Sequence, residues 1–146
     1  MIGDLLKRLM QPEPEQLDTL DFQLALTALL VRLARSDGYY AAAEIIRIEK
    51  IAMARFGLSQ DDAADLRGQA ERIEAEAPDT VRFTRAIKDA VPYEDRVSVI
   101  ESLWQVALSD GERDSDEDAV VRLVSSLLGV GDKDSALARQ RIAGQK

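Results

Sequence analysis

The stretch LDTLDFQLALTALLVRLARSDG, residues 17–38, predicts a long helix that ends in a turn. Its apolar residues recur at intervals of three and four, which is the period of a helix with one apolar face. Ser36, Asp37 and Gly38 follow this pattern, and Asp-Gly is a common turn sequence. We expect the helix to cover 17–35 and its inner side to carry Phe22, Leu26, Leu29, Leu30 and Leu33.

The same apolar period extends over the rest of the chain, and no stretch shows four or more clean apolar–polar alternations. The sequence therefore predicts an all-α fold, a bundle of seven to eight short helices in two pseudo-symmetric helix–loop–helix halves. Gly57 is expected to end one helix and Ser59 to cap the next. The other predicted helices cover about 2–10, 41–56, 60–75, 80–91, 93–109, 114–128 and 133–142.

The length of 146 residues suits one compact domain with a core that needs no covalent cross-links. We expect this single helical domain to cover 17–143. A short amphipathic helix within residues 1–12 precedes it, because Pro12 and Pro14 disfavour helix in the residues before them. Three locations stay open for this N-terminal helix: on the bundle, on a partner protein or on a membrane surface.

The composition excludes several kinds of chemistry. The chain has no His and no Cys, so it has no catalytic triad with an imidazole, no thiolate nucleophile and no zinc site of the usual kind. Any metal site must use oxygen ligands, which suit Ca²⁺, Mg²⁺ or Mn²⁺. With 19 Lys and Arg against 27 Asp and Glu, the formal net charge is −8, which argues against binding to nucleic acid.

Nothing in the sequence predicts an integral membrane segment. No apolar run approaches the roughly 18–20 residues that a helix needs to span a bilayer. The start MIGDLLKRLMQPEPE also lacks the long apolar region and the small-residue cleavage site of a signal peptide. We therefore expect a cytoplasmic protein.

The pattern A-x-S-D-G-x5-E occurs twice in the chain, at an offset of 73 residues. The first copy runs from Ala34 to Glu44 and the second from Ala107 to Glu117. Each copy lies between two predicted helices, so we interpret the segments 20–58 and 93–131 as a duplicated helix–loop–helix unit.

Helical spacing predicts that the acidic residues of both copies project inward from the rim of the core rather than into bulk water. Asp37 follows Leu33 by four positions, and Glu44 precedes Ile48 by four; Asp110 and Glu117 stand in the same relation to apolar residues of the second copy. If the two halves pack about a pseudo-twofold axis, the four carboxylates converge, and they repel one another unless they are protonated or neutralised. The predicted metal site consists of Asp37, Glu44, Asp110 and Glu117, with Asp114 and Asp116 as outer ligands.

A second interpretation of these residues needs no metal. Asp-Gly serves turns, and a Glu early in a helix is stabilised by the helix dipole. The spacing from Gly38 to Glu44 equals that in an EF-hand loop, but Leu33 and Arg35 stand where that loop has its first two ligands. A single loop of this kind cannot enclose Ca²⁺, so a metal site would be shared between the two loops.

The chain resembles the TerB-like family, the helical domain named for tellurite-resistance proteins. The resemblance is carried by LARSDGYY (33–40) with Glu44, by LWQVALSDG (103–111) with Glu117 and by LGV (128–130), and it extends over about 20–139. It implies an all-helical bundle of two similar halves with a metal site made by the paired acids, which fall here on Asp37, Glu44, Asp110 and Glu117. It also implies a link to tellurite and other chemical stress and to membrane-associated assemblies.

These observations predict a non-catalytic module that binds or senses a divalent cation in the response to tellurite or chemical stress. The expected partners are other proteins, including a membrane-associated stress-response complex. One alternative is a metal-independent helical scaffold or adaptor for protein–protein interaction, and another is a small metallohydrolase. We expect no enzymatic activity, because the sequence has neither a glycine-rich phosphate loop nor a nucleophile elbow.

Overall fold

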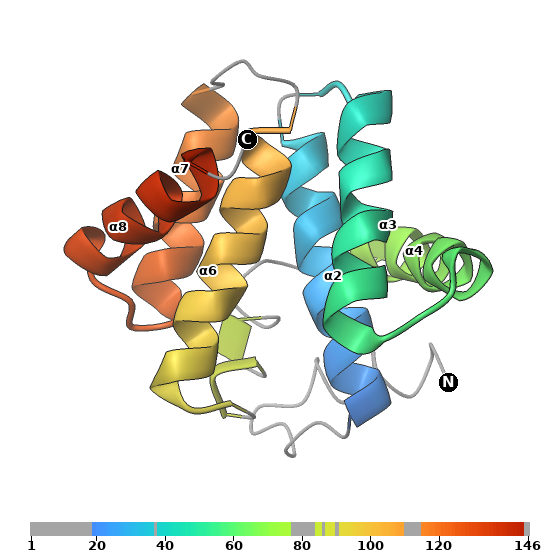
Figure 1. The fold of residues 1–146 in the computed structure, drawn as a ribbon, viewed down its shortest axis with the longest axis horizontal. Coiled ribbons are helices and arrows are strands. Elements are labelled where there is room, and N and C mark those ends of the chain that lie inside the picture. Colours follow the sequence, from blue (N-terminus) through green and yellow to red (C-terminus); the bar gives the residue numbers. More distant parts are fainter. Residues whose placement is uncertain are drawn as a thin grey trace.

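The computed structural model describes residues 19–36, 38–76, 84–85, 87–89, 91–109 and 115–144. These residues form helices and no strand, which confirms the all-α prediction (Figure 1). The predicted helix 2–10 lies outside the described residues, and so does much of 80–91, where 84–85 and 87–89 are helical. The longer helices are α2 (Thr19–Arg35), α3 (Ala42–Phe56), α4 (Gln60–Glu76), α6 (Tyr93–Ala107), α7 (Ser115–Leu127) and α8 (Asp132–Ala143).

The connection between α3 and α4 forms as the sequence predicts. Gly57 adopts a left-handed conformation with φ of 67° and ends α3. Residues other than glycine rarely adopt this conformation. The backbone N–H of Asp62 then donates a hydrogen bond to Ser59 Oγ at 3.1 Å. This contact satisfies one of the free amides in the first turn of α4, so Ser59 acts as its N-cap.

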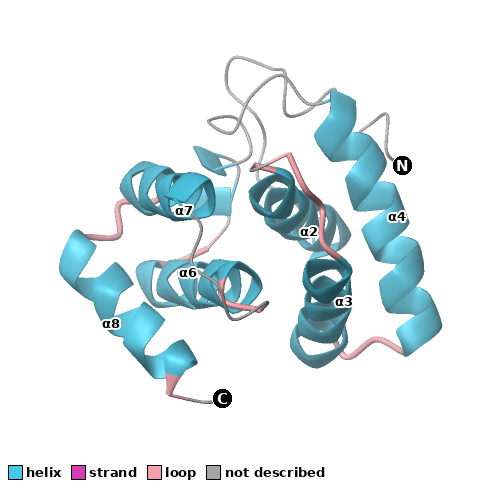
Figure 2. Ribbon diagram, turned by 90° about the horizontal axis from the view of Figure 1, so that it is seen from above, coloured by secondary structure: helices cyan, strands magenta, loops and turns pink. Residues whose placement is uncertain are grey.

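Four helices make the centre of the molecule, and the other two cover its sides. Viewed from above, α2, α3, α6 and α7 stand at four corners, with α3 and α7 diagonally opposite and α2 and α6 between them (Figure 2). Helix α4 packs against α2 and α3, and α8 packs against α6 and α7. The predicted duplication and pseudo-twofold axis stay predictions. None of the described helices is both long and apolar enough to cross a bilayer.

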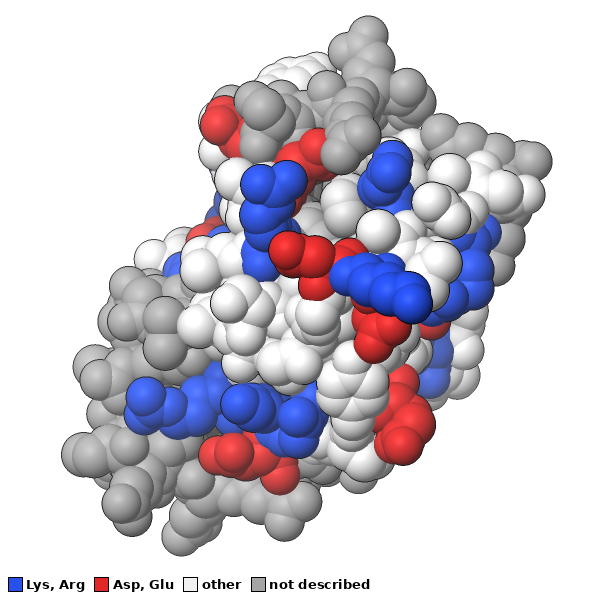
Figure 3. All heavy atoms as spheres, turned by 90° about the vertical axis from the view of Figure 1, so that its left-hand side faces the viewer, with Lys and Arg blue, Asp and Glu red and all other residues white. Residues whose placement is uncertain are grey.

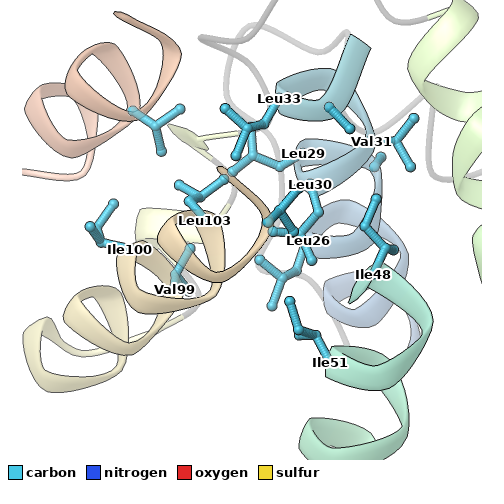
Figure 4. Packing of buried hydrophobic residues seen from close by; sticks show 14 of the residues in the cluster. Leu26, Leu29, Leu30, Val31, Leu33, Ile48, Ile51, Val99, Ile100 and Leu103 are labelled. Atoms are coloured by element: carbon cyan, nitrogen blue, oxygen red, sulfur yellow. The ribbon is translucent and has the colours of Figure 1, made fainter. Parts of the chain in front are cut away.

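Helix α2 supplies the centre of the hydrophobic core. Its predicted inner leucines, 26, 29, 30 and 33, are buried, whereas Phe22 at the start of the pattern is only partly buried. Figure 4 shows the leucines of α2 between Leu103 of α6 and Ile48 of α3. The burial of these side chains holds α3 and α6 on two sides of α2.

A buried polar cluster joins the last three helices. The indole N–H of Trp104 on α6 donates a hydrogen bond to the carbonyl oxygen of Ser135 on α8 at 3.1 Å. Ser125 Oγ on α7 donates a hydrogen bond to the carbonyl oxygen of Val121 at 2.8 Å and lies 3.3 Å from Ser135 Oγ, within hydrogen-bond distance. Because a buried indole N–H needs an acceptor, these contacts fix α8 in one position across α6 and α7.

Truncation of the α2 core should destabilise the whole bundle. We expect Leu29→Ala to lower the free energy of unfolding by about 2–5 kcal/mol, because it removes buried apolar surface and leaves a cavity. The measurement is urea unfolding followed by far-UV circular dichroism. The control is Leu123→Ala on α7, where the side chain is 47% exposed; its cost should stay within about 0.5 kcal/mol. Equal losses in the two variants would contradict the central role of α2.

Candidate functional site

The two Ser-Asp-Gly segments begin with the same local contact. Ser36 Oγ donates a hydrogen bond to the carbonyl oxygen of Leu33 at 2.7 Å, and Ser109 Oγ donates to that of Val106 at the same distance. Leu33 and Val106 are fully buried. In both copies, therefore, a serine hydroxyl closes the last turn of a core helix directly before the Asp-Gly pair.

The helix ends that flank the two segments lie at the same end of the bundle. The C-terminal ends of α2 and α6 and the N-terminal ends of α3 and α7 all point to that end (Figure 1). Gly38 turns the chain between α2 and α3 with φ of 81°, and its backbone N–H donates a hydrogen bond to the carbonyl oxygen of Arg35 at 3.0 Å. We call this end of the molecule the loop end.

Both predicted glutamates are buried at the loop end. Glu44 in the first turn of α3 is 2% exposed, and Glu117 in the first turn of α7 is 1% exposed. The backbone N–H of Ala41 donates a hydrogen bond to Glu44 Oε1 at 3.1 Å. The inward orientation predicted from helical spacing is confirmed for these two residues, which are more deeply buried than the rim position that the sequence predicts.

The other predicted ligands fall in two groups. Asp37, Asp110 and Asp114 lie outside the described residues. Asp116 is exposed in the first turn of α7, unlike its neighbour Glu117. Among the residues that the structure describes, no three acidic side chains lie close enough together to hold a metal ion. The four-carboxylate site therefore stays a prediction, and Glu44 and Glu117 are its described members.

The helix ends give the loop end a mixed electrostatic character. Glu44 and Glu117 occupy first turns, where unpaired backbone amides favour a negative charge. Helices α2 and α6 end between α3 and α7, and their last carbonyl oxygens carry partial negative charge (Figure 2). The loop end thus offers carboxylate and carbonyl oxygens, which are donors suited to a hard cation.

A polar network that the sequence did not predict holds the first loop against α4. The Arg35 guanidinium lies 5.1 Å from the centre of the Tyr40 ring, and the Tyr40 hydroxyl donates a hydrogen bond to Glu71 Oε2 at 2.9 Å. Arg67 forms ion pairs with Glu71 at 2.6 Å and with Glu49 at 2.7 Å. The segment that follows Gly38 is therefore connected to two other helices.

Sequence patterns could have predicted part of this network. Arg67 and Glu71 are four positions apart on one helix, a spacing that favours ion pairs. Arg32 and Arg35 stand out as the charged residues at the end of an apolar helix, and both pair with Glu74, at 3.2 and 2.8 Å. The contact between Tyr40 and Glu71 joins residues 31 positions apart, and helical spacing does not predict it.

Removal of the Tyr40 hydroxyl should change how stability depends on pH. Burial, followed by the hydrogen bond to Glu71, raises the pKa of Tyr40 above its usual value. The folded protein therefore binds this proton more tightly than the unfolded chain, so the stabilisation is complete below about pH 10 and is lost as the pH rises above that value. We expect Tyr40→Phe to cost about 0.5–1.5 kcal/mol at pH 7 and less at pH 11.

Urea unfolding of both proteins at pH 7, 9, 10 and 11 measures this difference. The matched control is Tyr39→Phe, because the Tyr39 side chain is 71% exposed, and its effect should be small at every pH. A cost of Tyr40→Phe that stays the same from pH 7 to pH 11 would show that the hydroxyl does not stabilise the loop through its proton.

Comparison with known proteins gives one family. The family model described as "Tellurite resistance protein TerB" matches residues 23–140. This range covers most of the chain and includes both Ser-Asp-Gly segments and both buried glutamates. Neither the comparison with curated proteins nor the comparison with solved structures gave a match.

Proposed function

Because the chain belongs to the family of tellurite resistance protein TerB, we propose that it is a non-catalytic module that binds a divalent cation at its loop end. Membership of this family implies a role in resistance to tellurite or related stress. The proposed ligands are Asp37 and Glu44 from the first loop and Asp110 and Glu117 from the second. Asp114 and Asp116 would act as outer ligands.

The observation that carries this proposal is the burial of Glu44 and Glu117 in the first turns of α3 and α7. A buried carboxylate is costly unless its charge is neutralised or it takes up a proton. A bound cation would supply that neutralisation. The chain has no His or Cys, so its donors are oxygens, and these fit Ca²⁺, Mg²⁺ or Mn²⁺.

Binding of a cation between the two loops would link the halves of the bundle. Helix α3 packs against α2 and α6, and α7 packs against the same two helices, so ligands from α3 and α7 constrain the whole centre of the molecule. A ligand that binds only the folded arrangement stabilises it. We propose that this rigid form presents a surface to other proteins, including a membrane-associated stress-response complex.

One contact favours a second candidate function, a metal-independent adaptor. The hydrogen bond from the Ala41 N–H to Glu44 Oε1 satisfies an amide at the start of α3 without any cation. In this case the acidic residues of the loops cap helices, and the protein acts through its helical surfaces alone. The two candidates differ in whether a divalent cation stabilises the protein.

The thermal unfolding midpoint of chelator-treated protein, titrated with Ca²⁺, Mg²⁺ and Mn²⁺, tests the cation site. We expect one ion to raise the midpoint saturably, with a stabilisation of about 2.7 kcal/mol when its concentration is 100-fold above Kd. The double variant Asp37→Asn/Asp110→Asn should lose this response, because it removes one proposed ligand from each loop.

The matched control for this titration is Asp61→Asn/Asp62→Asn. These two aspartates are exposed in the first turn of α4, so the variant removes the same charge from a helix start that the proposal does not involve. It should respond to the ion as the unmodified protein does. If no ion acts below millimolar concentration, or if both double variants respond alike, the cation site is wrong and the adaptor function is favoured.

A growth assay tests whether the buried glutamates matter for tellurite resistance. Cells that are sensitive to tellurite and express the protein should tolerate a higher tellurite concentration than cells without it. Glu44→Gln/Glu117→Gln keeps the side-chain size but removes both charges, and we expect it to abolish most of the protection. The same Asp61→Asn/Asp62→Asn variant is the control. Full protection by a folded glutamine variant would contradict a role for the carboxylates.

A further inference from the structure

A groove of about 400 Å³ runs between α3 and α6 on the outside of the bundle. The two helices are in contact, and Figure 2 shows them on the same side of the bundle. We call it the basic groove; its lining residues are Arg47, Lys50, Ile51, Ala54 and Arg55 of α3 and Ser102 and Gln105 of α6.

All the charged residues that line the basic groove are cations, although the chain as a whole has a net charge of −8. Arg47 and Lys50 are exposed. In the described part of the chain, neither of them nor Arg55 forms an ion pair, whereas Arg32 and Arg35 of α2 are both paired with a glutamate of α4. The positive charge of the groove is therefore not compensated by carboxylates within it.

Arg55 is held in the groove by neutral partners. Its Nη1 atom donates hydrogen bonds to Ser98 Oγ at 2.8 Å and to Ser102 Oγ at 3.3 Å. Burial lowers the pKa of Arg55, and the charges of Asp95 and Glu101 act in the opposite direction. A guanidinium has five N–H donors, so Arg55 keeps donors for a further acceptor while its position is fixed.

Other hollows of the surface lack this charge pattern. The hollow between α7 and α8 beside Trp104 contains Asp118 and Asp132 together with Arg122 and Arg139. From the side of these helices, Figure 3 shows basic and acidic side chains next to each other. An anion would meet repulsion there as well as attraction, which makes the basic groove the better candidate for an anionic ligand.

We propose that the basic groove binds a small molecule through a phosphate-type oxyanion group. Arg47 and Arg55 offer planar donor groups that match such an anion, and Lys50 adds a point charge. Three cations in one groove suit a doubly charged group better than a single carboxylate. Ile51 and Ala54 provide apolar wall for the rest of the ligand, and the groove volume is in the range of small-molecule sites.

This site is separate from the proposed cation site. The groove residues follow Glu44 along α3, and none of the proposed metal ligands lines the groove. The oxyanion has two sources, a free inorganic ion or the phosphate ester of a small organic molecule. The same cationic side chains would recognise the oxyanion of either source. The affinities of the two sources distinguish them, because only the organic molecule can also contact the apolar wall of the groove.

Nuclear magnetic resonance titration of the ¹⁵N-labelled full chain in 150 mM NaCl tests the proposal. The probes are inorganic phosphate and glycerol phosphate. We expect saturable shifts of the backbone amide signals of Ser98, Ser102 and Gln105 with at least one of them. Tighter binding of glycerol phosphate indicates an organic ligand, and tighter binding of inorganic phosphate indicates the free ion.

Two double variants separate a site from general attraction of anions. Arg47→Gln/Lys50→Gln removes two exposed cations from the groove, so the fold should persist while the affinity falls about tenfold or more. Arg72→Gln/Lys133→Gln removes the same charge from exposed positions on α4 and α8, and should leave the affinity within about twofold. Circular dichroism should be used to check that both variants are folded.

Three results would overturn the proposal. The first is that neither phosphate probe shifts the groove signals saturably. The second is that both double variants weaken binding equally, which is the behaviour of an unspecific electrostatic effect. The third is saturable binding of a glutamate-rich peptide at the groove in the absence of any binding of the two phosphates, which would make the groove a docking surface for an acidic protein segment.

Discussion

Helix α2 is enclosed by α3, α4, α6 and α7, and its side chains set the positions of these four helices. Its residues 24–31 are all buried, so it is apolar around most of its circumference rather than along a single stripe. Such a helix is stable only when other helices cover all of it. The loop end follows from this constraint, because α2 ends beside the end of α6, and each is followed by its own Ser-Asp-Gly segment.

The burial of Glu44 and Glu117 is a consequence of the same packing. Ile48 and Ile51 bury the face of α3 that Glu44 shares, and Val121 and Val124 do the same for Glu117 on α7. At these positions both carboxyl groups are almost completely shielded from water. The apolar residues therefore place two carboxyl groups in the interior, and the free energy that their burial costs has to be offset by interactions at the loop end.

The helices and the faces they bury could be predicted from the sequence, because one period of 3.6 residues decides both. The end of α3 at Gly57, the cap at Ser59 and the inward direction of the two glutamates all depend on local chemistry. The contact from Tyr40 to Glu71 and the groove between α3 and α6 could not be predicted in this way. They depend on which helices become neighbours, and the amphipathic period of one helix does not specify its partner. The convergence of Asp37 and Asp110 stays a prediction, since both lie outside the described residues.

The two proposed sites share helices, and this has a thermodynamic consequence. Helix α3 carries Glu44 in its first turn and the three cations of the basic groove further along, and α6 forms the other wall of the groove and leads into the second loop. An anion that contacts both helices favours one position of α3 relative to α6, and a cation bound between the loops favours one as well. Where the two positions agree, each ligand strengthens the binding of the other by the same factor. Where they differ, each weakens the other, so the packing of α3 on α6 decides the sign of the coupling.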